Sequence, residues 1–114
     1  MKILVVVREK AEADNIERML QRIVPISEAN EKECEGCCKV VGAAGDGKTG
    51  YEMIREECPD LVIADVELPE MGGLEMLEKL RGEHSDVKAV FLAEKEDFNQ
   101  AKRAVDLGVE GYLV

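Results

Sequence analysis

Five short apolar runs divide the chain, and a helical pattern follows each of them except the last. The first run, at residues 3–7, is apolar at every position, as expected for a strand that is buried on both faces of a parallel sheet. The runs that predict strands are residues 3–7, 39–43, 61–64, 87–92 and 111–114. This strict alternation predicts a doubly wound α/β domain, because right-handed crossovers place helices on both faces of the sheet.

The segments between the predicted strands carry apolar residues at helical spacing. Pro25 helps to end the first helix, Asp97 is the expected N-cap of the fourth, and Gly108 ends that helix. The positions expected to face the core are Ile16, Met19, Leu20 and Ile23, then Tyr51 and Ile54, then Leu74, Leu77 and Leu80, and finally Ala101, Ala104 and Val105. Each helix therefore presents one apolar face to the sheet.

Length and net charge exclude several classes of function. The chain has 114 residues, enough for one domain, and its 15 Lys and Arg against 25 Asp and Glu give a net charge of −10. This charge repels nucleic-acid phosphates and anionic lipids. No apolar run approaches the roughly 20 residues of a membrane span. We therefore expect a cytoplasmic domain that binds neither nucleic acid nor a membrane directly.

Doubly wound folds place their chemistry at the carboxyl ends of the strands, here Val7–Glu9, Asp65–Pro69 and Ala93–Glu94. The segment around the second of these, PDLVIADVELPEMGGLEML at residues 59–77, resembles the central part of the CheY-like receiver domain of two-component response regulators. The resemblance extends to three further pieces, MKILVVV at the start, VVGAAGDG in the middle and DLGVEGYLV at the end. It therefore covers nearly the whole chain.

The resemblance implies both a topology and a function. The topology is a flavodoxin-like, five-stranded parallel sheet of order 2-1-3-4-5. The function is signal transduction in a two-component phosphorelay, in which a histidine kinase or phosphotransfer protein transfers a phosphoryl group to Asp65. The phosphorylated domain would then act on a downstream protein partner. Such a domain is a signalling module and not an enzyme.

A phosphoryl site in this family also needs positive charge, which Mg²⁺ supplies. The resemblance implies Mg²⁺ held by Asp65 and by the backbone carbonyl of Glu67, with Glu9 or the Glu67 side chain as a weaker ligand. Where the family has two acidic residues after the first strand, however, this chain has Val7 and Arg8. We therefore expect Arg8 to lie within salt-bridge reach of Asp65 and to weaken Mg²⁺ binding.

Other positions of the family pattern are kept or lost in this chain. Pro69 follows the phosphoacceptor position, and Tyr112 resembles the aromatic switch residue, but Ala93 stands where the family has Ser or Thr. The Lys expected after Val114 and the fifth helix lie beyond the sequence. We predict that residues 1–114 are a receiver domain that lacks its final helix. Apolar sheet surface near the first helix would then be left for a homodimer or a missing segment.

Two other functions stay open. One is a pseudo-receiver that uses the same face for interactions independent of phosphorylation. The other is nucleotide binding, because residues 42–49, GAAGDGKT, match the P-loop pattern G-x-x-x-x-G-K-[ST]. In that mechanism Lys48 would reach the outer phosphates and Thr49 would help to hold Mg²⁺.

A long insertion at about residues 24–38 carries Cys34, Cys37 and Cys38 as C-x-x-C-C, and Cys58 lies further along the chain. A zinc site usually needs four ligands, so Cys58 or the lone His84 would have to complete the cluster. Nothing in the sequence marks export, which favours reduced, unpaired thiols over Zn²⁺ or a redox pair.

Overall fold

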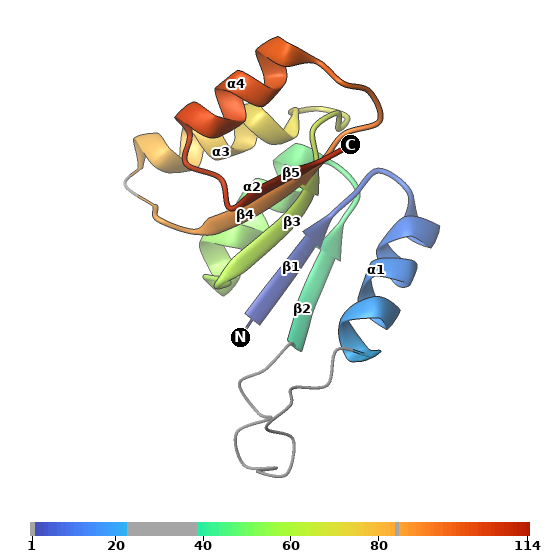
Figure 1. The fold of residues 1–114 in the computed structure, drawn as a ribbon. Helices are drawn as coiled ribbons and strands as arrows, with labels where there is room; N and C mark the ends of the chain where they lie inside the picture. The colour runs from blue at the N-terminus through green and yellow to red at the C-terminus, as the bar shows by residue number, and fades with distance from the viewer. Residues whose placement is uncertain (1, 23–38, 84) are drawn as a thin grey trace, which may run out of the picture.

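A single parallel sheet forms the centre of the computed structural model, which describes residues 2–22, 39–83 and 85–114 (Figure 1). Its order is β2-β1-β3-β4-β5, and every neighbouring pair is parallel. The strands are β1 (Lys2–Val6), β2 (Lys39–Ala44), β3 (Leu61–Asp65), β4 (Lys88–Leu92) and β5 (Gly111–Leu113). The predicted flavodoxin-like topology and strand order are therefore confirmed.

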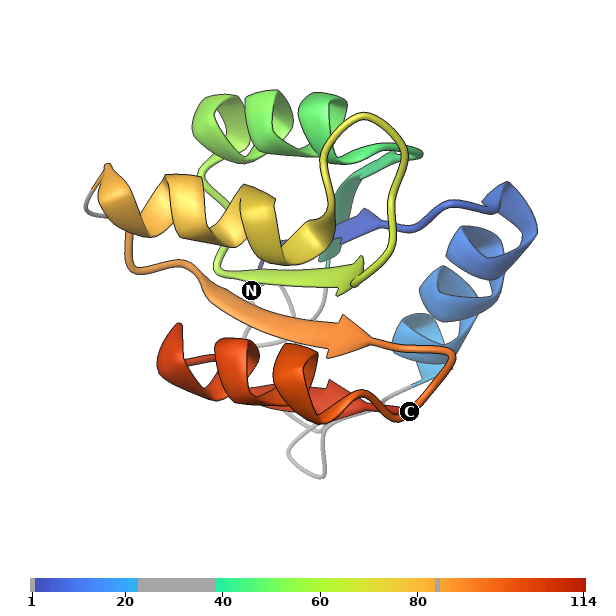
Figure 2. The same cartoon turned by 90° about the horizontal axis from the view of Figure 1, so that it is seen from above.

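Four helices cover the sheet unequally. They are α1 (Lys10–Arg22), α2 (Gly47–Glu57), α3 (Gly73–Gly82) and α4 (Phe98–Asp106). Figures 1 and 2 show α1 standing apart from the other three. Within the described residues, no helix has the length and apolar character needed to cross a membrane.

The two faces of the sheet have separate cores, and this explains the uninterrupted apolar run in β1. Leu4 and Val6 pack into the larger core, which contains residues of α2, α3 and α4. Ile3 and Val5 face the other way, into a small core with Ala13 of α1. Because successive side chains of a strand point to opposite faces, a strand between two cores must be apolar at every position.

The helix termini follow the predicted signals. The carboxylate of Asp97 accepts hydrogen bonds from the backbone N–H groups of Asn99 and Gln100, so Asp97 is the N-cap of α4 as predicted. The helix ends at Asp106, and Gly108 has a φ of +74°, a left-handed conformation that glycine adopts without strain.

Two predicted core positions are wrong. Val105 is 73% exposed, whereas its neighbour Ala104 is completely buried. Adjacent helical residues lie about 100° apart around the helix axis. Because α4 packs against the core through Ala104, the side chain of Val105 faces solvent. Met19 is 65% exposed, and the residue of α1 that is buried in the small core is Ala13. Ile23 lies outside the described residues.

Part of the sheet face on the α1 side is open at β5. Leu113 is 58% exposed there. It pairs with Leu92 of β4, which is only partly buried on the same core as Ala13. An apolar sheet surface of this kind was expected, and the homodimer proposed to cover it stays a prediction.

Candidate functional site

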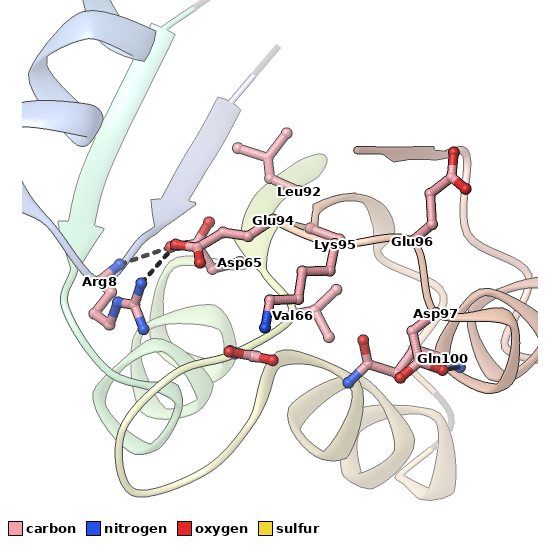
Figure 3. Close-up of a pocket in the computed structure, with 11 residues that line it drawn as sticks. Arg8, Asp65, Val66, Leu92, Glu94, Lys95, Glu96, Asp97 and Gln100 are labelled. Carbon is pink, nitrogen blue, oxygen red and sulfur yellow. Dashed lines mark hydrogen bonds and ion pairs between the residues drawn. The ribbon is translucent and has the colours of Figure 1, made fainter.

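Asp65 is the last residue of β3 and opens onto a cavity of about 120 Å³ at the carboxyl edge of the sheet (Figure 3). Strand register brings the walls of this cavity together. Val6 pairs with Ala64, which places the residues after β1 beside Asp65. Asp65 itself pairs with Leu92, so the loop at 93–97 forms the opposite wall. Three segments far apart in the sequence therefore meet at one carboxylate.

Arg8 contacts Asp65 through its backbone N–H group, whereas its guanidinium contacts a different carboxylate. Its backbone N–H donates a hydrogen bond of 2.9 Å to Asp65 Oδ2. Its guanidinium Nη2 lies 2.7 Å from Glu94 Oε1. The predicted ion pair between Arg8 and Asp65 is thus not formed among the described residues. Glu94, at the rim of the cavity, offers Arg8 a more exposed carboxylate, which costs less desolvation than pairing with the half-buried Asp65.

Burial is the main reason that the pKa of Asp65 is raised. The nearby negative charges of Glu94 and Glu9 raise it further, while the N–H group and the positive charge of Arg8 lower it. Glu12 of α1 shows a related effect. Its pKa is raised first by burial and then by the charges of Asp65, Glu9 and Glu94. Negative charge is therefore concentrated around Asp65, and the cation of Arg8 offsets only part of it.

The described residues do not assemble the carboxylates of the implied metal site. No three Asp, Glu, His or Cys side chains in residues 2–22, 39–83 and 85–114 converge closely enough to hold a metal ion. Glu9 and Glu67 are both exposed, and Val7 is buried and apolar. The side chains of Asp65, Glu67 and Glu9 therefore do not form a three-carboxylate cluster in this part of the chain, and the magnesium site that would use the Glu67 carbonyl stays a prediction. The arrangement does not fit a divalent ion held by three carboxylates.

The backbone behind Asp65 depends on a glycine. The N–H of Gly73, the first residue of α3, donates to the carbonyl of Val66. A Cβ at this position would lie 2.2 Å from the carbonyl oxygen of Asp65. Only glycine lets α3 begin so close to the end of β3. Nearby, the exposed Pro69 accepts hydrogen bonds from the N–H groups of Gly47 and Met71, which ties this loop to α2.

The segment that follows β4 lines the cavity with Ala93, Glu94 and Lys95. Ala93 continues the ladder, with its N–H bonded to the Leu113 carbonyl at 2.7 Å, and it offers no hydroxyl to the cavity. Glu94 and Lys95 follow it and line the same cavity (Figure 3). The position of Glu94 after the carboxyl end of a strand pointed to it in the sequence, whereas Lys95 was not predicted.

Tyr112 is half-buried and packs against the larger core. Its hydroxyl is buried and has no hydrogen-bond partner among the described residues. Burial raises its pKa, and the charge of Asp97 adds to the effect. Its role as a switch residue stays a prediction.

The P-loop match has a structural explanation that leaves no place for a phosphate. Asp46 is the N-cap of α2, and its carboxylate accepts hydrogen bonds from the N–H of Thr49 at 2.7 Å and from its hydroxyl at 2.9 Å. The N–H of Gly47 donates to Pro69. The helix terminus that would bind phosphate therefore already holds a carboxylate of the protein itself.

The predicted thiol cluster is only partly described. Its members that lie outside the described residues are Cys34, Cys37, Cys38 and His84. Cys58 is an exposed free thiol at the end of α2, where it adopts a left-handed backbone conformation with a φ of 49°. It lies before β3, at the edge of the sheet opposite Asp65. The cluster, Zn²⁺ and the redox pair stay predictions.

Comparisons with solved structures agree with the topology. The isolated REC domain of RcsB from Salmonella enterica serovar Typhimurium superposes with a TM-score of 0.81 at 14% identity, covering 100% of this chain and 76% of that one. At this level of identity the likeness establishes the fold alone.

Sequence comparisons identify the family. The family described as "Response regulator receiver domain" matches residues 25–114. Response regulator GacA from Pseudomonas viridiflava is 37% identical over 75 residues, which are 66% of this chain and 35% of that protein. The nitrate/nitrite response regulator NarL from Escherichia coli K12 is 35% identical over 75 residues with the same coverage. This chain thus spans about a third of the length of these relatives, and it belongs to the response regulator receiver domains of two-component systems.

Proposed function

We propose that Asp65 is the phosphoacceptor of this receiver domain. The observation that carries the proposal is its position as the last residue of β3, half-buried, with its carboxylate at the wall of a cavity. Its raised pKa marks a more basic carboxylate than an ordinary surface Asp, and such a carboxylate is the better nucleophile. The attack on phosphorus requires the ionised form of this carboxylate.

The transfer exchanges one bond to phosphorus for another. An Asp65 carboxylate oxygen attacks the phosphorus of a phosphohistidine on the donor protein. The O–P bond forms while the N–P bond breaks, and the electron pair of that bond returns to the imidazole nitrogen, which then takes a proton from water. The product is an acyl phosphate on Asp65, whose phosphoryl group carries a charge of roughly −1.5 to −2 in place of the single charge of the carboxylate. The main requirement of this transfer is positive charge near the three phosphoryl oxygens.

This function makes the chain a signalling module and not an enzyme. The donor would be a histidine kinase or a phosphotransfer protein. The new charge would act on the loop at 93–97 and on α4, which that loop joins to β4. A downstream protein that contacts α4 and β5 would then distinguish the two states.

Intact-mass measurement tests the proposal directly. The purified chain is incubated with a small phosphoramidate, whose N–P bond resembles that of phosphohistidine, in buffers with and without Mg²⁺. We expect the mass to increase by one phosphoryl group, and the increase to disappear in Asp65→Asn. Asp60→Asn is the matched control, since Asp60 lies at the amino end of β3 and accepts a hydrogen bond from the backbone N–H of Lys2. If no condition gives an adduct on Asp65, the pseudo-receiver function replaces this proposal.

A further inference from the structure

We propose that the guanidinium of Arg8 leaves Glu94 and binds the phosphoryl oxygens on Asp65, supplying charge that other receivers take from Mg²⁺. The inference rests on the proposed role of Asp65 as phosphoacceptor. It follows from a disagreement within the site, where the carboxylates for a metal do not converge and a permanent cation occupies the position of one of them.

The position of Arg8 is suited to this task. Its backbone is held 2.9 Å from Asp65 Oδ2 by a hydrogen bond, so its Cα cannot drift away from the reacting group. Its side chain lines the same cavity as Asp65 (Figure 3). A guanidinium has five N–H donors, and the contacts with described residues use only Nη2. The remaining donors are free to bind oxygen atoms of a ligand in the cavity.

The present partner of Arg8 is a weak competitor. The side chains of Arg8 and Glu94 are 42% and 72% exposed, and ion pairs this exposed contribute little to stability. A phosphoryl group carries more charge than a carboxylate, and it presents paired oxygens that match the guanidinium fork. It would also stand on the half-buried Asp65, where water screens the attraction less than at the rim. Exchange from Glu94 to the phosphoryl group is therefore favourable.

The exchange also gives phosphorylation a route to α4. Glu94 follows Ala93, which has no hydroxyl to bind a phosphoryl oxygen and so cannot pull the loop inward. Loss of Arg8 instead releases Glu94 from the end of β1. The loop it belongs to ends at Asp97, whose carboxylate caps α4 through the N–H groups of Asn99 and Gln100. In this chain, the transfer of Arg8 from Glu94 to the phosphoryl group would link phosphorylation to α4. It would do so in place of a hydroxyl group at position 93.

Metal dependence and variants of Arg8 test this inference. The chain is treated with phosphoramidate in EDTA and, separately, in excess Mg²⁺, and adduct formation is followed by intact mass. We expect the adduct to form in EDTA, and Arg8→Ala to slow its formation there by about 10- to 100-fold, the loss expected for one charge-assisted contact. Arg8→Lys should retain part of the rate. Glu94→Gln, which removes the competitor, should increase it.

Arg8→Asp provides a test in the opposite direction. It places a carboxylate beside Asp65, so we expect adduct formation to fail in EDTA and to return with Mg²⁺. Arg103→Ala is the matched control, because Arg103 is 46% exposed, close to the 42% of Arg8, and forms its ion pair with Glu78 between α3 and α4, away from the cavity. Its rates should equal those of the unmodified chain in both buffers.

A spectroscopic measurement detects contact between Arg8 and the phosphoryl group independently of the rate of adduct formation. In ¹⁵N-labelled protein, the Nε–H resonance of Arg8 should move on phosphorylation, while that of Arg103 stays in place and neither moves in Asp65→Asn. If an adduct forms only with Mg²⁺, or if Arg8→Ala leaves the rate in EDTA unchanged, the role of Arg8 is wrong and Asp65 remains the phosphoacceptor. If no adduct forms in any buffer, both proposals fail.

Discussion

Two aspartates lie at the carboxyl ends of β2 and β3, the strands on either side of β1, and their carboxylates have opposite surroundings. Asp46, after β2, receives two hydrogen bonds from Thr49 at 2.7 and 2.9 Å, and these bonds lower its pKa. Asp65, at the end of β3, receives one bond from the N–H of Arg8, and burial raises its pKa. The same residue type at similar positions is therefore stabilised as an anion in one place and destabilised in the other.

This difference distinguishes the carboxylate that caps a helix from the one proposed to react. Both carboxylate oxygens of Asp46 accept hydrogen bonds from Thr49 in the first turn of α2, so this carboxylate stabilises the start of a helix. Asp65 keeps one oxygen without a protein donor among the described residues, at the wall of a cavity. The number of donors around each carboxylate, more than the motif that contains it, is what favours Asp65 over Asp46 as the proposed phosphoacceptor.

The largest effect should come from the glycine that supports Asp65. Gly73→Ala places a methyl group 2.2 Å from the Asp65 carbonyl oxygen, a contact that only a backbone shift can relieve. We expect the free energy of unfolding to fall by about 2–3 kcal/mol, the upper range for overpacking. Urea unfolding measures it. Gly82→Ala is the control, since a Cβ there meets nothing within 4 Å, and it should stabilise by about 0.4–1 kcal/mol. Equal stability of the two variants would contradict this assignment.

Removal of the Asp46 side chain should have the next largest effect. Asp46→Ala takes both acceptors from Thr49 and leaves the first turn of α2 without its cap. We expect the midpoint of thermal unfolding to fall by roughly 5 °C, and Asp46→Asn, which keeps an acceptor oxygen, to fall by less. Circular dichroism follows both transitions. A phosphoryl adduct should still form on either variant, whereas loss of the adduct would mean that Asp46 also serves the reaction.

Much of this arrangement was predictable from the sequence, because it depends on patterns that the backbone imposes. Residues 3–7 are apolar throughout because β1 lies between two cores, and the alternation of strands with helices leaves few topologies. The resemblance at residues 59–77 then supplied the strand order and Asp65. The N-cap at Asp97 and the left-handed Gly108 follow from local chemistry alone.

The errors arise where two neighbouring choices are equally compatible with the pattern. Helical spacing allows either Ala104 or Val105 to face the core, and only packing at close range selects the alanine. In the same way, sequence places Arg8 near Asp65 but does not say which carboxylate its flexible side chain reaches. Glu94 became the partner because the register of β3 and β4 brings it to the same cavity. That register could not be read from Arg8 or Glu94 individually.

The two aspartates should respond to pH with opposite signs. The pKa of Asp65 is raised in the folded state, so its ionisation costs stability at neutral pH and costs nothing below the unfolded pKa of about 4. Asp65→Asn, which can still accept the Arg8 N–H, should therefore raise the unfolding midpoint at pH 7, and the gain should vanish as the pH falls through 4. The folded pKa of Asp46 is lowered, so its contribution is present above about pH 4 and is lost in acid.

Parallel thermal melts of both Asn variants between pH 3 and 7 measure this contrast. Relative to the unmodified chain, Asp46→Asn should be less stable at pH 7, with a deficit that shrinks in acid. Both variants remove one carboxylate, so a change in net charge alone would shift them in the same direction. Two curves of the same sign would mean that the charge of the whole chain, and not the donors around each aspartate, controls their stability.

The smallest effect should come from the ion pair beside Asp65. A double-mutant cycle with Arg8→Ala and Glu94→Gln should give a coupling energy below about 1 kcal/mol that declines with added salt, because both side chains are largely in contact with water. The matched cycle with Arg103→Ala and Glu78→Gln should give a similar value. This weakness is what the proposed exchange requires. A coupling well above that of the control pair would mean that Glu94 holds Arg8 too firmly for the phosphoryl group on Asp65 to displace it.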